Sequence, residues 1–182
     1  MDVHLLLGGA RSGKSSTAQR LVESRELEPV YLATALVDPG DAEFVARVDK
    51  HRADRGPAWT TVEEPRDLVG ALRRHRRPGT GLVVDCLTLW LSTALEEERD
   101  LGPELDALCA ELAAGEGLVV LVSNEVGLGL VPMHPVGRAF RDAQGRVNQR
   151  VAAVADHVAL LVAGLPLVLR GDAPPTAPAR PG

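Results

Sequence analysis

The stretch Gly8-Gly9-Ala10-Arg11-Ser12-Gly13-Lys14-Ser15 decides the fold, because it joins an apolar run over residues 3–7 to a helical pattern over residues 15–26. It matches the pattern G-x4-G-K-[ST], whose glycines let the backbone wrap closely around phosphate groups. The amino end of the following helix adds about half a positive charge at the same place. The sequence therefore predicts a strand, a phosphate-binding loop and a helix in succession. The alternative is a chance glycine-rich turn, which the strand-loop-helix context disfavours.

Two side chains of this loop have predicted roles in nucleotide binding. Lys14 supplies a positive charge for the β and γ phosphates, and Ser15 offers a hydroxyl group to Mg2+.

Short apolar runs recur along the chain and alternate with segments of helix length. We expect further strands over residues 30–34, 82–85, 118–123, 158–162 and 167–169, and a helix over residues 41–54. Apolar strands that alternate with helices are typical of a mainly parallel sheet covered on both faces, which predicts a three-layer α/β domain. Residues 163–166 are too few for a crossover helix, so the last two strands are expected to form an antiparallel edge hairpin.

Length and composition limit the organisation of the chain. With 182 residues, of which 45% are hydrophobic, and a mean hydropathy of +0.01, it is long and apolar enough to bury one core. We expect one domain over residues 1–170. The tail over residues 171–182 is rich in proline and poor in apolar side chains, so we expect it to be disordered.

Charge and cysteine content disfavour several classes of protein. A formal net charge of -5 and only 3% aromatic residues disfavour nucleic-acid binding. No apolar run approaches the roughly 18 residues of a membrane span, and the amino-terminal segment has no basic leader. Cys86 and Cys109 lack the paired spacing of a zinc site or a disulfide framework. We therefore expect a cytoplasmic protein.

Two acidic residues follow predicted strands. Asp85 ends the run over residues 82–85 and is a candidate to hold a water molecule bound to Mg2+; the alternative is a helix cap or a solvent-facing strand end. Glu125 opens a segment with two glycines, which is either a mobile loop above the carboxyl ends of the strands or an ordinary surface connection.

His51 is a candidate nucleophile. Phe44, Val48 and His51 recur at helical spacing, with Arg47 and Arg55 one turn to either side. Flanking guanidinium groups favour the neutral imidazole, which is nucleophilic, and guanidinium groups also bind phosphates. From this pattern alone, a half-buried or interface histidine in an arginine-rich helix remains the alternative.

Several basic residues have weaker indications. One group ends a predicted helix and is expected to be a solvated helix end: Arg73, Arg74, His75, Arg76 and Arg77. A second group follows the glycine-containing loop, where phosphate contacts and a salt-bridged surface helix both remain open: Arg138, Arg141, Arg146 and Arg150. We expect His4 to be a packed or edge residue, and His134 has no assigned role.

Taken together, these motifs resemble the bifunctional adenosylcobinamide kinase / adenosylcobinamide-phosphate guanylyltransferases of cobalamin biosynthesis. The likeness runs from Leu5 to about Leu169. Its blocks are GGARSGKS at 8–15, YLAT at 31–34, RVDKHRADRGPAWTTVEEP at 47–65, NEVGLGLVP at 124–132 and RAFRDAQGRVNQRVA at 138–152. Two local differences from relatives are Arg55-Gly56-Pro57, where an Arg-Pro pair is common, and Asp85, where glutamate is frequent.

The resemblance implies a RecA-type P-loop NTPase domain that uses ATP or GTP to phosphorylate adenosylcobinamide. It further implies transfer of GMP from GTP to that phosphate through a covalent guanylyl-histidine at His51, with release of pyrophosphate. Lys14 and His51 are then catalytic, Ser15 and Asp85 bind Mg2+, and the assembly is a homotrimer. The nucleotide contacts implied are Gly8, Gly9, Ala10, Arg11, Ser12, Gly13, Lys14, Ser15, Ser16, Thr34, Glu63 and Asp85.

Two other functions remain open from the sequence. A single-activity P-loop kinase for another small alcohol needs no nucleophilic histidine. A nucleotide-binding switch binds GTP without a covalent adduct, although the guanine-reading Asn-Lys-x-Asp tetrapeptide of many GTPases is absent.

Overall fold

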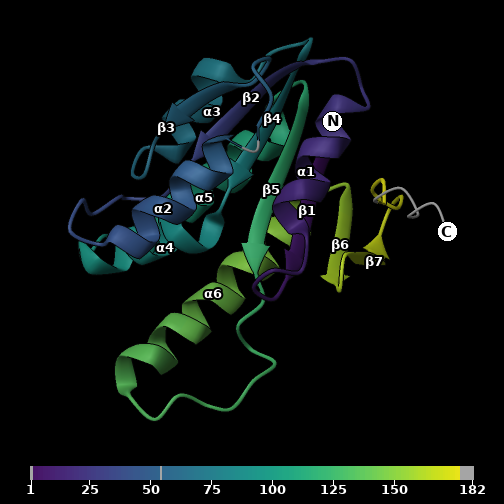
Figure 1. The fold of residues 1–182 in the computed structure, drawn as a ribbon. Helices are drawn as coiled ribbons and strands as arrows, with labels where there is room; N and C mark the ends of the chain where they lie inside the picture. The colour runs from purple at the N-terminus through teal and green to yellow at the C-terminus, as the bar shows by residue number, and fades with distance from the viewer. Residues whose placement is uncertain (1, 54, 177–182) are drawn as a thin grey trace, which may run out of the picture.

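One seven-stranded sheet forms the centre of the computed structural model, which describes residues 2–53 and 55–176 (Figure 1). In spatial order the strands are β3 (Thr60–Glu63), β2 (Glu28–Ala33), β4 (Thr80–Asp85), β5 (Leu118–Asn124), β1 (Asp2–Gly8), β6 (His157–Val162) and β7 (Leu165–Arg170). Every neighbouring pair is parallel except β6 and β7. The predicted mainly parallel sheet with an antiparallel edge hairpin is confirmed.

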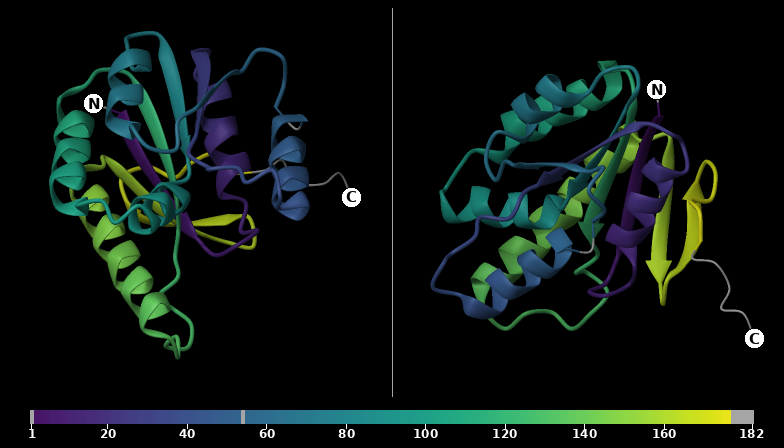
Figure 2. Two further views of the ribbon diagram at one scale, coloured as in Figure 1. Left: turned by 90° about the vertical axis from the view of Figure 1, so that its left-hand side faces the viewer. Right: turned by 45° about the horizontal axis from the view of Figure 1, so that its top comes forward.

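The helices cover the two faces of this sheet unequally (Figure 2). They are α1 (Lys14–Glu23), α2 (Ala42–Ala53), α3 (Leu68–His75), α4 (Leu87–Glu96), α5 (Leu101–Ala114) and α6 (Pro135–Val154). Apolar residues of α3, α4, α5 and α6 pack on one face, whereas α1 packs on the other. The three layers expected from the sequence are therefore helix, sheet and helix.

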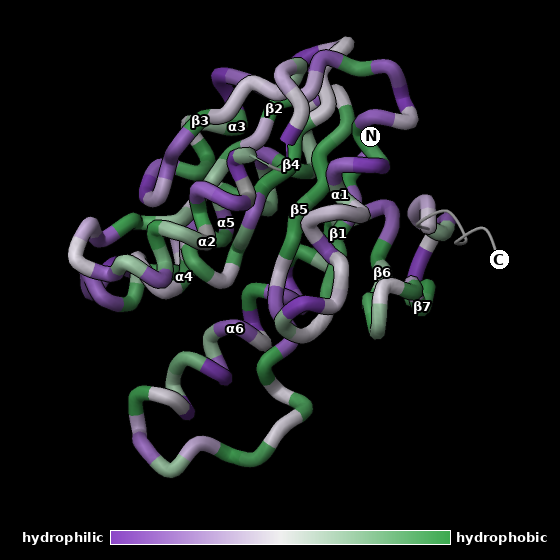
Figure 3. The backbone as a smooth tube through the Cα atoms, in the orientation of Figure 1, coloured by the Kyte–Doolittle hydropathy of each residue, from purple (hydrophilic) through white to green (hydrophobic). Residues whose placement is uncertain are grey.

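The alternation of side chains along each strand divides the core in two. In β1, Leu5 faces the four-helix side and Leu6 faces α1; in β5, Leu121 and Val120 divide in the same way. Both sides of the central strands are buried because helices cover both faces. This double coverage explains why these strands appear in the sequence as continuous apolar runs (Figure 3).

The strand β3 was not predicted. Its sequence, Thr60-Thr61-Val62-Glu63, has no apolar run, and three of its four side chains are exposed. It pairs in parallel with β2 at the edge of the sheet, where one side of the strand has no neighbour in the sheet. A short polar edge strand of this kind limits unwanted pairing with other chains.

Arg76 corrects the expectation of a solvated helix end over residues 73–77. Its side chain is only 9% exposed, and Nη1 donates to the carbonyl oxygens of Glu111 at 2.8 Å and Leu112 at 3.1 Å. These carbonyls belong to the last turn of α5, where Glu111 also accepts from the Gly115 N–H at 3.1 Å and the Leu112 carbonyl lies past the last four-residue helical bond. Arg76 therefore caps α5, and a Cβ at position 115 would lie 2.4 Å from its Nη1, which accounts for Gly115.

The carboxyl-terminal segment begins with an ordered contact after β7. The backbone N–H of Asp172 donates to Nδ1 of His157 at 2.8 Å, and Pro174 is buried. Residues 177–182 of the predicted disordered tail lie outside the described residues, and so does Asp54. The disorder of the tail as a whole stays a prediction.

Helix α6 and the segment leading into it extend away from the sheet (Figure 1). Five apolar side chains of this region are at least 63% exposed: Leu128, Leu130, Val131, Met133 and Val136. We call them the arm patch, and Figure 3 shows hydrophobic residues along this segment. Among residues 2–53 and 55–176, no helix combines the length and the apolar character that crossing a membrane requires.

Candidate functional site

The phosphate-binding loop lies between β1 and α1, as the sequence predicts. Gly13 caps α1 with φ 96°, and Arg11 has φ 56°, so the loop turns through the left-handed region twice. A Cβ at position 8 would lie 2.5 Å from the carbonyl oxygen of Leu161. The loop also contacts the β6–β7 turn, where the Gly164 N–H donates to the Ser12 carbonyl at 3.0 Å. Glycine is therefore needed at position 8, because the backbone of β6 passes too close for a side chain.

Lys14 lies folded against its own loop. Its Nζ donates to the carbonyl oxygens of Gly8 at 2.8 Å and Gly9 at 2.6 Å, and to Ser12 Oγ at 3.3 Å. Three acceptors match the three donors of an ammonium group. Burial lowers the pKa of Lys14, and the negative charge of Asp85 opposes that shift. The ammonium group is thus held against the backbone carbonyl oxygens of its own loop.

The predicted site residues lie along one edge of the sheet. In register, Gly8 pairs with Asn124, Ala33 pairs with Asp85, and Ala33 also pairs with Glu63. Because all of these strands are parallel, their carboxyl ends meet at this edge, where open α/β sheets bind ligands. Four strand spacings of about 4.8 Å separate β1 from β3, so the row extends over roughly 19 Å.

Asp85 is held by an aromatic cluster that the sequence did not reveal. The hydroxyl of Tyr31 donates to Asp85 Oδ2 at 2.5 Å. Arg55 lies over the Tyr31 ring, with Cζ 3.9 Å from the ring centroid, and Trp59 packs edge-on against the same ring at 6.1 Å. Burial and the neighbouring Asp85 carboxylate raise the pKa of Tyr31, which keeps its hydroxyl a donor. Asp85 is therefore an oriented carboxylate, not a loose strand end.

Thr34 and Glu63 lie on either side of this cluster. Thr34 is fully buried, and its hydroxyl donates to the Cys86 carbonyl at 2.6 Å while its N–H donates to the Asp85 carbonyl at 3.1 Å. Glu63 is exposed and forms an ion pair with Arg52 of α2. Thr34 thus fixes the backbone after Asp85, whereas the Glu63 carboxylate links the end of β3 to α2.

His51 lies in α2, one residue before Arg52, and the structure describes its backbone but not its side chain or that of Arg47. The Arg52–Glu63 ion pair places this end of α2 beside the carboxyl end of β3. The described side chains of α2 are all exposed or half-buried, Phe44 and Val48 among the latter. The helix therefore lies on the body of the protein without entering either core cluster.

The loop after β5 is joined to the phosphate-binding loop. The Glu125 N–H donates to the Gly8 carbonyl at 3.1 Å, and Glu125 Oε1 accepts from the Gly127 N–H at 2.5 Å. Arg141 donates to the Gly127 carbonyl at 2.8 Å, and Arg138 donates to the carbonyl of Met133 at 2.6 Å. Arg138 and Arg141 thus bind backbone carbonyl groups of the loop after β5. Arg146 and Arg150 are exposed, and Arg150 forms an ion pair with Asp106.

A buried network of polar side chains from α6 binds the carboxyl end of β5. Asn148 Oδ1 accepts from Ser123 Oγ at 2.6 Å and from Gln144 Nε2 at 3.0 Å, and Asn148 Nδ2 donates to the Asn124 carbonyl at 3.2 Å. Thr88 Oγ1 accepts from the Asn124 N–H at 2.9 Å. This network fixes the peptide groups beside the phosphate-binding loop. The sequence of α6 did not indicate that Gln144 and Asn148 are buried.

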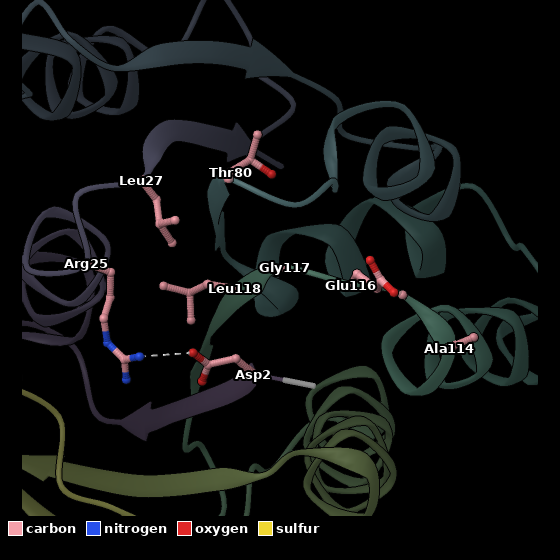
Figure 4. A pocket seen from close by; sticks show the side chains of 10 residues that line it. Asp2, Arg25, Leu27, Thr80, Ala114, Glu116, Gly117 and Leu118 are labelled. Atoms are coloured by element: carbon pink, nitrogen blue, oxygen red, sulfur yellow. Dashed lines mark ion pairs between the residues drawn. The ribbon is translucent and has the colours of Figure 1, made fainter.

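The opposite edge of the sheet carries a separate pocket of about 640 Å3 (Figure 4). Its wall includes Asp2 and Arg25, which form an ion pair at 3.4 Å, and Glu116. None of the predicted site residues whose side chains the structure describes lines it. We call it the amino-edge pocket, and it is not the site that the motifs predict.

His4 is a packed residue near this edge, as expected from the sequence. Its ring stacks on His157 at 4.2 Å, and its Nε2 lies 2.6 Å from Asp2 Oδ1. These three side chains approach one another closely enough to bind a metal ion. However, His157 Nδ1 accepts from the Asp172 N–H, so the neutral ring carries its proton on Nε2, which faces Asp2. The cluster is therefore organised by hydrogen bonds and stacking.

Comparisons of sequence give a consistent family. Residues 4–169 match the family model described as cobinamide kinase / cobinamide phosphate guanyltransferase. The bifunctional adenosylcobalamin biosynthesis protein CobP of Pseudomonas aeruginosa is 44% identical over 170 residues, which are 92% of this chain and 97% of that protein. The corresponding protein CobU of Salmonella typhimurium is 36% identical over 88% of this chain and 96% of its own length.

Solved structures with little sequence identity share the fold. The flagellar accessory protein FlaH of Methanocaldococcus jannaschii has a TM-score of 0.53 at 13% identity and covers 93% of this chain and 78% of its own. The ATPase EscN of enteropathogenic Escherichia coli has a TM-score of 0.50 at 14% identity, over 89% of this chain and 43% of its own. Fold, phosphate-binding loop and sequence agree, and the chain belongs to the cobinamide kinase / cobinamide phosphate guanyltransferase family of transferases.

Proposed function

We propose that the protein catalyses two successive transfers at the carboxyl edge of its sheet. In the first, ATP or GTP phosphorylates the aminopropanol hydroxyl of adenosylcobinamide. In the second, GMP passes from GTP to that phosphate, giving adenosylcobinamide-GDP and pyrophosphate. The observation that carries the proposal is the row formed by the phosphate-binding loop, Asp85 and Glu63 along one sheet edge, next to the helix of His51.

Nucleotide phosphates are proposed to bind the loop through its backbone N–H groups and Lys14. The residues that we assign to the nucleotide are Gly8, Gly9, Ala10, Arg11, Ser12, Gly13, Lys14, Ser15, Ser16, Thr34, Glu63 and Asp85. In this assignment, Lys14 gives up its contacts with the Gly8 and Gly9 carbonyls for phosphate oxygens. Its charge then compensates the negative charge that develops in the transition state.

The residues near the loop fit Mg2+, which prefers oxygen ligands. Ser15 offers a hydroxyl group at the first turn of α1. Asp85 Oδ2 accepts from Tyr31, which leaves Oδ1 to accept from a water molecule of the ion. When bound, the ion neutralises phosphate charge; these two side chains orient it.

His51 is proposed to carry GMP between the two substrates. A ring nitrogen of neutral His51 attacks the α phosphorus of GTP, and the bond to the bridging oxygen breaks to release pyrophosphate. A phosphate oxygen of the acceptor then attacks the same phosphorus, and the P–N bond breaks to return the imidazole. Covalent catalysis divides one difficult displacement into two easier ones.

The test is intact-protein mass spectrometry after incubation with GTP and Mg2+, with an alkaline quench because phosphoramidates are acid-labile. We expect a gain of one GMP in the wild type without any corrinoid present. His51→Ala should show no gain, and His75→Ala is the matched control because His75 ends α3 on another part of the chain. A folded wild type that binds GTP and gains no mass would contradict the guanylyltransferase half.

A kinase assay on adenosylcobinamide, run beside the mass measurement, separates the other candidate functions. A single-activity kinase phosphorylates its alcohol without a covalent adduct, and it stays active in His51→Ala. A nucleotide-binding switch binds GTP and transfers nothing. Phosphorylation of adenosylcobinamide by both the wild type and His51→Ala, together with the adduct in the wild type alone, is the result expected for the bifunctional enzyme.

We also propose that the protein is a cytoplasmic homotrimer. The arm patch and the strand β7, which exposes Leu165, Leu167 and Leu169, are two separate apolar surfaces on one chain. Two different surfaces that dock on each other between copies generate a closed ring when the rotation allows it. Leu130→Glu should therefore lower the molar mass in multi-angle light scattering from three chains to one, whereas a wild type of one chain would contradict the trimer.

A further inference from the structure

A second pocket, of about 460 Å3, lies at the carboxyl edge, on the side of Asp85 away from the phosphate-binding loop. One wall is the segment that follows β2, including Leu36 and Val37; the other is a face of α4 that includes Leu89 and Ser92. We call it the α4 pocket. Because β2 and β4 are neighbouring parallel strands, both walls follow adjacent carboxyl ends.

The α4 pocket is close to the reacting groups. Helix α4 begins two residues after Asp85, and Leu89, Ser92 and Glu96 follow one another at spacings of three and four, which places them on one face. From Leu89 to Glu96 the face extends over roughly 10 Å, at about 1.5 Å per residue. A ligand that fills this pocket therefore reaches from the Asp85 end of the site outward along the helix.

The charge of the α4 pocket disfavours phosphate groups. Asp38 and Glu96 line it, and among the residues whose side chains the structure describes, no lysine, arginine or histidine does. Glu96 Oε1 accepts from Ser92 Oγ at 3.0 Å, and Asp38 Oδ1 accepts from the Gly40 N–H at 2.8 Å. Each carboxylate keeps a second oxygen for which the described residues provide no donor. The pocket suits a ligand with N–H donors and apolar surface, and it repels anions.

We infer that the α4 pocket binds the carboxamide-bearing periphery of the corrinoid acceptor. This inference rests on the proposed function. Cobinamide is a cationic cobalt corrin whose rim carries primary carboxamide groups, so it offers N–H donors to both carboxylates and apolar ring surface to Leu36 and Leu89. Guanine also has N–H donors, but they lie on one edge of a flat base, whereas Asp38 and Glu96 belong to two different walls.

Equilibrium dialysis of adenosylcobinamide against the full chain tests this assignment, because binding is measured whether or not any group is transferred. Two variants alter the pocket: Glu96→Lys reverses one charge, and Ser92→Phe fills the space. Loss of one charged hydrogen bond weakens binding by about tenfold or more, so we expect the Kd for adenosylcobinamide to rise at least that much in Glu96→Lys. We expect a rise of similar size in Ser92→Phe, because the phenyl ring occupies the space that the ligand needs. Glu116→Lys makes the same charge change in the amino-edge pocket and should leave the Kd unchanged.

Binding of GTP and formation of the GMP adduct are measured on the same samples. If the wild type forms no adduct, the proposed function fails while the corrinoid Kd still reports on the pocket. Unchanged corrinoid binding in both pocket variants would overturn the inference. A corrinoid Kd that rises only in Glu116→Lys would also overturn it. A Kd for GTP that rises in the pocket variants while the corrinoid Kd is unchanged would overturn it too, because the pocket would then bind guanine.

Discussion

The hydroxyl of Tyr31 donates to Asp85 Oδ2 at 2.5 Å across the neighbouring strands β2 and β4. The contact fixes one oxygen of the carboxylate, and the described residues offer no hydrogen-bond donor to the other. Tyr31 is itself held between the guanidinium group of Arg55 and the ring of Trp59. Tyr31 is therefore a positioning residue for Asp85, and it acts through that side chain.

Replacing Tyr31 with phenylalanine should lower kcat for both transfers by about tenfold, with little change in the KM for nucleotide. The ring remains packed against Trp59, so the cost in unfolding free energy should be only about 1 kcal/mol. Steady-state kinetics and urea unfolding measure the two effects. Trp59→Phe is the control, because its Nε1 donates to the exposed Glu23 and not to Asp85. Equal kcat in Tyr31→Phe and Trp59→Phe would refute the positioning role.

Lys14→Met should lower both transfer rates by at least about 100-fold, because the charge that faces the phosphates is lost while the length of the side chain is kept. The nucleotide Kd, measured by calorimetry, should rise as well. Arg25→Met removes a cation at the opposite edge of the sheet and serves as the control. Wild-type nucleotide affinity in Lys14→Met would show that the loop binds phosphate through its backbone alone.

Asn148→Ala should destabilise the fold by about 2–4 kcal/mol, because Ser123 Oγ, Gln144 Nε2 and the Asn124 carbonyl all lose a buried partner. The measurement is the urea midpoint at an unchanged m-value. Gln149→Ala, an exposed change at the next position of α6, should leave the midpoint within error. A midpoint for Asn148→Ala that matches Gln149→Ala would mean that water satisfies these groups.

His4 makes the stability of the fold depend on pH. Burial lowers its pKa below the ordinary 6.5, although the Asp2 carboxylate opposes the shift. Between the lowered pKa and 6.5, the unfolded chain binds more protons than the native one, so the unfolding free energy falls as pH falls through this window. Above 6.5 the contribution vanishes. His4→Phe should therefore lose less stability than the wild type between pH 7.5 and pH 5.5, by urea unfolding; parallel losses would contradict this.

The central fold was predictable because parallel strands covered on both faces leave an unambiguous pattern. The runs that became β1, β4 and β5 are apolar at nearly every position, and the short link before β7 allows only a hairpin. The strand β3 was missed because a polar edge strand resembles a loop in sequence. Its pairing comes from β2, a partner some thirty residues earlier in the chain.

The candidate site was predictable only where neighbours in sequence are also neighbours in space. The phosphate-binding loop is local, and its motif predicted the succession of strand, loop and helix that the structure has, with the helix beginning at Lys14, one residue earlier than expected. By contrast, the Tyr31–Asp85 contact joins residues 54 positions apart and exists because β2 and β4 pair in register. Burial of Arg76 likewise depends on α5 ending beside it, which no property of the arginine cluster indicates.

The hydrogen bond from Gly164 to the Ser12 carbonyl makes one of the earliest loops of the chain depend on one of its last turns. On the ribosome, β1 and the phosphate-binding loop emerge first, but β6 and the β6–β7 turn follow only after most of the protein has been made. Until then β1 lacks its β6 neighbour, and the loop lacks the backbone that rests against Gly13. A chain cut short before residue 157 therefore carries the complete motif but lacks β6 and the turn that support the loop.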